Sequence, residues 1–165
     1  MRLSKTLYLG YGLGVLALLL DQFHKFAMLE WVQIAARPPI EVTSFFNLVM
    51  VWNHGVSFGL FSDTDPNNAY FLIGLALCIC IALLVWLHKT ELHLEAAAIG
   101  MIIGGALGNV VDRVRFGAVA DFFDFHFSGY HYPAFNIADA AIFLGVGALF
   151  FVSVRNGRKP CKDAD

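Results

Sequence analysis

Residues 104–113 read GGALGNVVDR, and this stretch decides how the rest of the chain is interpreted. Its first half consists of small and apolar residues, whereas its second half carries an amide, a carboxylate and a guanidinium at Asn109, Asp112 and Arg113. Charged groups at the end of an apolar helix are costly to keep there, so they usually serve a function. The stretch therefore predicts an apolar helix whose end contributes to a polar site.

The composition is that of an integral membrane protein. Of 165 residues, 58% are hydrophobic and 15% are charged, and the mean hydropathy is +0.65. The length suggests one domain covering residues 1–165. No run of basic residues suggests a nucleic-acid partner. The three cysteines form neither a disulfide framework nor a zinc-ligand spacing, so we expect no metal and no cofactor.

Four apolar segments, at about residues 7–27, 69–87, 94–113 and 134–154, are each close to the ~20 residues needed to cross a bilayer. The first has no convincing signal-peptide cleavage site, so we interpret it as a retained span. Polar segments at about 30–68 and 115–133 separate the spans. Within them, residues 40–43 and 46–52 have the β-branched and aromatic composition of short strands, and residues 121–127 suggest a strand or an interfacial segment.

The distribution of lysine and arginine predicts the orientation. Both ends of the chain and the loop at Lys89 are basic, whereas residues 30–68 contain only Arg37. Arg113 and Arg115 run against this trend without outweighing the basic tail. We therefore expect both termini in the cytoplasm and both polar segments outside.

Polar residues gather at the outer end of this arrangement. Gly100, Gly104 and Gly108 repeat every four residues, a pattern that lets helices approach closely, and Gly105, Asn109 and Asp112 lie near that face. Asp21 and Lys25 are spaced for an ion pair on one helical face. That pair marks either the water interface or a nearby active site. Asn53, two residues before Gly55, indicates either a turn alone or an amide placed beside the membrane.

Asp121, Asp139 and Asn136 join this group from the second polar segment and the fourth span. Two carboxylates held together in a partly dehydrated site resist ionising together, so one acts as an acid while the other acts as a base. Hydrolysis of an amide by activated water requires this combination. The two carboxylates titrate as a pair.

Other chemistries remain as alternatives. Ser57 and Ser128 lack a nucleophile-elbow motif. A metal site is conceivable from Asp121, Asp124, His126 and His131, although no HExxH helix is present. A proton-coupled carrier is a second class, but the carboxylates cluster at one end and no internal repeat is evident. An assembly protein with a polar packing cluster is a third class, for which neutral substitutions would affect stability more than turnover.

The chain resembles the lipoprotein signal peptidases, also called signal peptidase II. The resemblance rests on five motifs in order along nearly the whole chain: DxxxK from Asp21, NxGxxF from Asn53, GGALGNxxDR at 104–113, VxDF from Val119 and FNxADxxI from Phe135. It implies an aspartic endopeptidase of the bacterial inner membrane, acting as a monomer. The implied substrate is a prolipoprotein carrying diacylglycerol on cysteine, cut on the N-terminal side of that cysteine, with membrane lipid around it.

The resemblance also implies roles for residues of this chain. Asp121 and Asp139 match the catalytic pair, and the supporting or substrate-binding positions are Asp21, Lys25, Asn53, Gly105, Asn109, Asp112, Arg113 and Asn136. The implied fold is an all-α integral membrane protein with four transmembrane helices, a small extracytoplasmic β-cradle and an interfacial helical arm. The chain departs from the family pattern at His54, Ser57 and Ala140, which puts local hydrogen bonding there in doubt.

Overall fold

Four long helices and one small antiparallel sheet make up the computed structural model, which describes residues 5–55 and 66–157. The elements follow in the order α1 (Lys5–Phe26), η1 (Ala27–Trp31), η2 (Ile34–Ala36), β1 (Ile40–Thr43), β2 (Phe46–Asn53), α2 (Pro66–Leu87), α3 (His93–Phe116), β3 (Val119–Phe127), β4 (Tyr130–His131) and α4 (Ile137–Gly157). The prediction of a mainly helical chain with four spans is confirmed.

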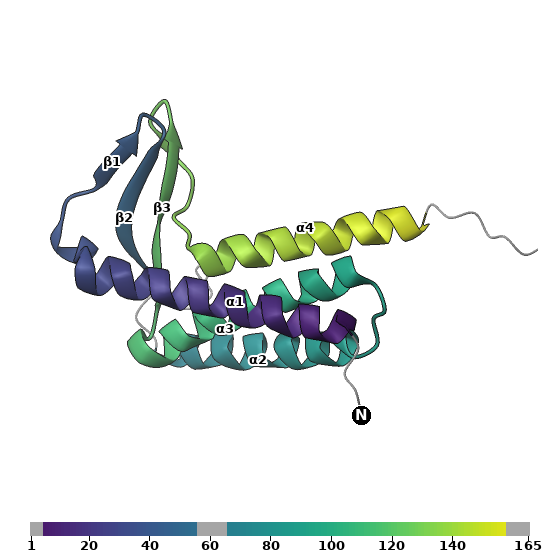
Figure 1. Cartoon of the computed structure of the whole chain (residues 1–165). Coiled ribbons are helices and arrows are strands. Elements are labelled where there is room, and N and C mark those ends of the chain that lie inside the picture. Colours follow the sequence, from purple (N-terminus) through teal and green to yellow (C-terminus); the bar gives the residue numbers. More distant parts are fainter. Residues whose placement is uncertain (1–4, 56–65, 158–165) are drawn as a thin grey trace, which may run out of the picture.

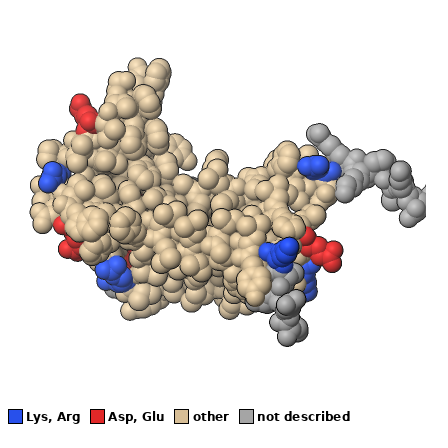
Figure 2. Space-filling view, in the orientation of Figure 1, with Lys and Arg blue, Asp and Glu red and all other residues tan. Residues whose placement is uncertain are grey.

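The four helices have the properties of membrane spans. Within the described ranges, α1 to α4 are each long and apolar enough to cross a bilayer. Figure 1 shows them running side by side, with the sheet at one end and with the start of α1 and the end of α4 at the other. On the face drawn in Figure 2, charged residues lie toward the two ends and the surface between them is uncharged. This is the surface expected of a protein that sits across a hydrocarbon layer.

Helix α3 is the centre of the bundle because it contacts α1, α2 and α4. In an apolar stretch of 18 residues from each helix, 61% of the stretch in α3 is buried inside the protein. The corresponding shares for α1, α2 and α4 are 22%, 11% and 17%. The predicted glycine face packs against α1: a Cβ added at Gly100 or Gly104 would overlap the backbone carbonyl of Gly10 or Gly14. Small residues therefore bring the backbones of α1 and α3 together, as the spacing predicted.

The sheet has the order β1-β2-β3-β4, with each neighbouring pair antiparallel. Both strands predicted in the first polar segment are present, and residues 119–127 form a strand in the second. On β3, Ala120 and Phe122 pack with Met28 of η1 and Ile34 of η2 in one buried cluster. This packing holds the start of β3, and with it Asp121, against the ends of the helices.

Helix boundaries differ from the predicted ones where local interactions were not visible in the sequence. Helix α4 begins at Ile137 instead of residue 134, because Phe135 still bridges to Phe123 of the sheet. Helix α3 continues to Phe116 and ends where Gly117 adopts a φ of 74°, the left-handed conformation that glycine accepts readily. The resemblance implied a helical arm without giving its position; the short helices η1 and η2 lie between α1 and β1.

Candidate functional site

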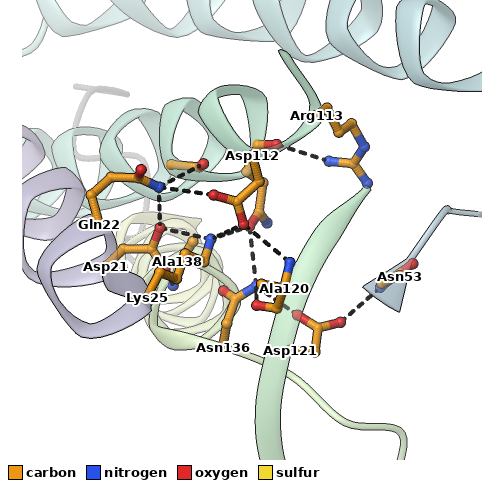
Figure 3. Close-up of polar contacts among 12 residues, drawn as sticks. Asp21, Gln22, Lys25, Asn53, Asp112, Arg113, Ala120, Asp121, Asn136 and Ala138 are labelled. Carbon is orange, nitrogen blue, oxygen red and sulfur yellow. Dashed lines mark hydrogen bonds and ion pairs between the residues drawn. The ribbon is translucent and has the colours of Figure 1, made fainter. Parts of the chain in front are cut away.

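The residues that the sequence singled out come together where α1, α3 and α4 meet β2 and β3. Figure 3 shows most of them in one connected set of hydrogen bonds and ion pairs. Of the charged members, Asp21 and Asp112 are 0% and 1% exposed, and Lys25 and Asp121 are 2% and 1% exposed. Charges buried to this degree require partners, and each partner can be named.

Asn136 and Asp139 form the N-terminal cap of α4. The side-chain Oδ1 of Asn136 accepts the backbone N–H of Asp139 at 2.9 Å, while Oδ2 of Asp139 accepts the backbone N–H of Asn136 at 3.2 Å. This reciprocal arrangement is a capping box, with Asn136 as the N-cap and Asp139 three residues later. The cap fixes the position of the Asp139 carboxylate at the start of the helix.

The Asp121 carboxylate lies on β3 and accepts two side-chain hydrogen bonds. Nδ2 of Asn136 donates to its Oδ1 at 2.7 Å, and Nδ2 of Asn53 donates to its Oδ2 at 3.0 Å. The pKa of Asp121 is raised from the ordinary 3.8 to about 6. Burial is the largest cause, the hydrogen bond from Asn53 opposes the increase, and the nearby charge of Asp139 adds to it. Asp121 therefore holds a proton at a higher pH than a surface aspartate does.

Asn53 ends β2 in a turn and also reaches Asp121. Its Oδ1 accepts the backbone N–H of Gly55 at 2.9 Å, and Gly55 has a φ of +86°. This Asx-type turn leaves Nδ2 of the same amide directed at the carboxylate. The turn alone, one of two interpretations of the sequence, thus accounts for only half of what this side chain does.

The amide of Asn109 connects Lys25 to Asp139. Its Nδ2 donates to Asp139 Oδ1 at 2.8 Å, while its Oδ1 accepts from Lys25 Nζ at 3.3 Å and lies 3.2 Å from Nδ2 of Asn136. Because an amide has one acceptor end and one donor end, the ammonium on one side orients the donor toward the carboxylate on the other.

Lys25 forms ion pairs with both Asp21 and Asp112, each at 2.8 Å. The pair of Asp21 and Lys25 had two interpretations from the sequence, and its burial excludes the one in which it merely marks the water interface. Each carboxylate also accepts a backbone N–H: Asp21 from Ala138 at 2.9 Å, and Asp112 from Ala120 at 3.1 Å. The three charges thus join α1 to α3, α4 and β3.

The sequence analysis missed Gln22. Its Nε2 lies 3.1 Å from Asp21 Oδ2, from Asp112 Oδ1 and from the carbonyl oxygen of Gly108. An amide next to an aspartate in a helix gives no distinctive signal of its own, because only the packing of α1 on α3 brings these acceptors within reach. Gln22 supplies hydrogen-bond donors to two buried carboxylates that share one lysine.

Gly105 and Gly108 allow the helices to approach one another at the site. A Cβ added at Gly105 would overlap the carbonyl oxygen of Ala138 in α4 and lie 2.9 Å from Ile142 Cγ1. A Cβ added at Gly108 would come within 2.5 Å of Asp21 Oδ2. Gly105 therefore does not bind through a side chain; its predicted contribution is the room it leaves for the first turn of α4.

Arg113 makes few hydrogen bonds with the part of the chain that the structure describes. The described residues offer its guanidinium one hydrogen bond, from Nη1 to the carbonyl oxygen of Asn109 at 3.5 Å, and its buried Nε has no partner among them. Arg113 and Asn109 line the end of an apolar groove of about 270 Å³ between α2, α3 and α4, which also includes Leu72, Leu75 and Ile142. A second, larger cavity of about 500 Å³ lies on another face of α4 and is lined by Asp139, Ala140, Phe143 and Leu144 together with Tyr132 and Phe135.

The residues of the metal alternative are not gathered with Asp121. Asp124 points to the other side of β3, where its Oδ1 lies 2.8 Å from Nδ1 of His131 and its Oδ2 accepts from Asn47 at 3.2 Å. Burial favours the neutral acid, but these hydrogen bonds and the charges of His131 and His126 outweigh it and lower the pKa of Asp124. Within residues 5–55 and 66–157, no three His, Cys, Asp or Glu side chains are arranged to hold a metal ion.

The three residues that depart from the family pattern, His54, Ser57 and Ala140, differ in where they lie relative to the site. His54 is exposed beside the Asn53 turn, and Ala140 lines the larger cavity next to Asp139. Ser57 lies outside the described residues. No hydrogen bond of the Asp121 and Asp139 carboxylates described above involves the side chain of His54 or Ala140.

Comparison with known proteins gives one consistent result. A family model described as signal peptidase (SPase) II matches residues 13–155. The lipoprotein signal peptidase of Methylobacterium sp. (strain 4-46) is 39% identical over 150 residues, covering 91% of each chain. That of Azoarcus sp. (strain BH72) is 45% identical over 140 residues, covering 84% of this chain and 78% of the relative. A solved structure of a bacterial membrane enzyme superposes with a TM-score of 0.78 at 28% identity, covering 94% of this chain and 93% of that one.

Proposed function

This chain belongs to the signal peptidase II family, and from that membership we propose that it is an aspartic endopeptidase that removes the signal peptide from diacylglyceryl-modified prolipoproteins. The proposed cut lies on the N-terminal side of the lipidated cysteine. Asp121 and Asp139 are the proposed catalytic residues, and neither a metal nor another cofactor is required in this mechanism. The proposed working unit is a monomer.

One observation carries this proposal: the Asn136 side chain links the Asp121 carboxylate to the backbone of Asp139. It donates to Asp121 from Nδ2 and accepts the backbone N–H of Asp139 at Oδ1. The raised pKa of Asp121, about 6, is what one member of an acid and base pair needs. We assign the shared proton of the pair to Asp121, so that Asp139 takes the role of the base.

The mechanism needs only these two groups and one water molecule. The Asp139 carboxylate removes a proton from water as its oxygen attacks the scissile carbonyl carbon, and protonated Asp121 donates to the carbonyl oxygen. The resulting tetrahedral intermediate collapses when the carbon–nitrogen bond breaks: the proton held by Asp139 passes to the leaving amine, and one hydroxyl of the intermediate returns its proton to Asp121 as the carbon–oxygen double bond re-forms. The products are a signal peptide with a new carboxylate and a lipoprotein whose cysteine has a free amino group.

Two apolar grooves suit the two apolar parts of such a substrate. We propose that the signal peptide lies in the groove between α2, α3 and α4. The Arg113 donors that have no partner among the described residues lie at its end and can bind peptide carbonyl groups. The acyl chains then occupy the cavity beside Phe143 and Leu144, which are 78% and 60% exposed on α4. The groove opens between apolar helices and the cavity lies against apolar residues of α4, so the substrate reaches the carboxylates without leaving the bilayer.

The proposed orientation places the sheet outside the cytoplasm, as an extracytoplasmic β-cradle, and both termini inside. The bias of lysine and arginine toward the terminal side supports it. Exposed aromatic residues lie near both ends of the spans: Trp31, Trp52 and Tyr132 toward the sheet, and Tyr8, Tyr11 and Trp86 toward the other end. Such aromatic belts are typical of the two membrane interfaces. An inner membrane with a lipidated substrate on its outer leaflet is the corresponding location.

The test is cleavage of a diacylglyceryl-modified precursor by the purified chain, with the unlipidated precursor as the matched substrate. The proposal predicts cleavage of the lipidated form only, unaffected by a strong chelator. Loss of cleavage with the chelator and recovery with added metal ions would favour the metal alternative. Aspartate-dependent proton flux through reconstituted vesicles without any cleavage would instead favour a carrier.

A further inference from the structure

We infer that the buried group of Asp21, Lys25 and Asp112 is a positioning device that holds both catalytic aspartates in register through the backbone. This inference rests on the proposed function, because it takes Asp121 and Asp139 as the reacting pair. It assigns to the group an effect on the rate of the chemical step, beyond any contribution to folding.

The geometry is the same on the two sides of Lys25. Asp112 accepts the N–H of Ala120, the residue immediately before Asp121, at 3.1 Å. Asp21 accepts the N–H of Ala138, the residue immediately before Asp139, at 2.9 Å. Both carboxylates are bound by the same ammonium, each at 2.8 Å. One lysine thus holds the two carboxylates that bind the backbone N–H of the residue before each reacting aspartate, and Figure 3 shows this arrangement.

Lys25 also reaches Asp139 by a third route. Its remaining donor lies 3.3 Å from Oδ1 of Asn109, and Nδ2 of Asn109 donates to Asp139 at 2.8 Å. An ammonium has three donors, and here each has an oxygen acceptor. The ammonium nitrogen therefore has no donor left for substrate, and its side chain is 3% exposed, so Lys25 acts through other residues.

The need for an external acceptor at Ala138 follows from helix geometry. Ala138 is the second residue of α4, so its N–H has no partner within the helix. The N-cap side chain of Asn136 serves the N–H of Asp139, and Asp21 of α1 serves that of Ala138. The first turn of α4 is thus anchored to another helix at the residue preceding Asp139. A misplacement of about 1 Å in a reacting group costs about 10²-fold in rate.

The test compares Asp112→Leu with Asp112→Asn in the full-length chain. Leucine keeps the approximate size but removes the acceptor for the Ala120 N–H, whereas asparagine keeps one carbonyl oxygen for it. Single-turnover cleavage of the lipidated precursor is expected to fall by about 10²-fold for Asp112→Leu and by clearly less for Asp112→Asn, with KM nearly unchanged in both. Lys25→Met is expected to lose at least as much as Asp112→Leu; if it does not fold, the two Asp112 variants decide the outcome.

Ile99→Ala is the matched control for a simple loss of stability. Ile99 is fully buried on α3, in the cluster with Leu7 and Leu87, and does not contact the charged group. This variant should lower Tm yet cleave at the wild-type rate when assayed well below its Tm. The inference is overturned if folded Asp112→Leu cleaves at the wild-type rate, or if its rate recovers at low temperature as that of Ile99→Ala does. If Asp121→Asn keeps its activity, the proposed function fails instead.

Discussion

The side chain of Asn136 lies between Asp121 and Asp139 and is bonded to both residues: Nδ2 donates to the Asp121 carboxylate at 2.7 Å, and Oδ1 accepts the backbone N–H of Asp139 at 2.9 Å. Asn136 is fully buried. The same amide therefore caps α4 and sets the position of one carboxylate relative to the other.

Two substitutions separate these roles of Asn136. Serine is a good N-cap but has no amide to donate to Asp121, whereas alanine loses both functions. We expect Asn136→Ala to lower the free energy of unfolding by about 1 kcal/mol and Asn136→Ser to change it little. Both variants should lose most cleavage activity. A fully active Asn136→Ser protein, by precursor cleavage assay, would show that the bond to Asp121 is dispensable.

The pH dependence follows from the raised pKa of Asp121. A group with a raised pKa is protonated below it, and here the protonated form is the acid of the mechanism. The value of kcat/KM reports the free enzyme, so it should fall as the pH rises through about 6. The fall in kcat should occur at higher pH, because bound substrate excludes water from the site and so raises the pKa of Asp121 further. A kcat/KM that rises through pH 6 would contradict assigning the proton to Asp121.

Removing the Asn53 amide should shift the pH at which kcat/KM falls, and the direction of the shift can be predicted. Its hydrogen bond stabilises the ionised Asp121 and so lowers the pKa, partly offsetting the effect of burial. Asn53→Ala should therefore shift the alkaline limb of kcat/KM to higher pH. The rate at the optimum should also fall, because Asp121 loses one of its two fixed contacts. An unchanged or lower limb in a pH titration of the variant would argue against this contact.

The close approach of α3 and α4 predicts the effect of a single methyl group. Gly105→Ala would place Cβ against the Ala138 carbonyl and push the first turn of α4 outward. Overpacking of this kind costs about 1–3 kcal/mol of stability, and displacement of Asp139 should also reduce cleavage. Gly147→Ala on α4, where the added Cβ would have no atom within 4 Å, is the control and should keep both Tm and activity. Equal behaviour of the two variants would contradict the close contact.

The sequence predicted the parts of this molecule that depend on composition and local spacing. Four apolar segments, the strands predicted at residues 40–43 and 46–52, and the glycine face of α3 follow from patterns within single segments. The predicted start of α4 was three residues too early. Phe135 bridges to Phe123 of the sheet, and such a tertiary contact is not visible in a local sequence pattern.

The site was predictable to a similar extent. Residue types and motifs selected the polar residues that the fold brings together. The role of Gln22 and the bonds from Asp21 and Asp112 to the backbone N–H groups of Ala138 and Ala120 could not be foreseen. The bonds of Gln22 and Asp21 join residues far apart in the chain, which the packing of α1 on α3 and α4 brings together. The bond of Asp112 to Ala120 depends on how the chain turns from α3 into β3.

The most direct test of the central claim is the initial rate of cleavage of a purified diacylglyceryl-modified precursor by Asp121→Asn and Asp139→Asn. The control is Asp124→Asn, the same chemical change three residues along β3 on its other side, where the carboxylate contacts His131. We predict that both dyad variants lose at least ~10³-fold in rate while inserting and folding normally, and that Asp124→Asn stays close to wild type. Cleavage within tenfold of the wild-type rate by either dyad variant would contradict the proposed pair.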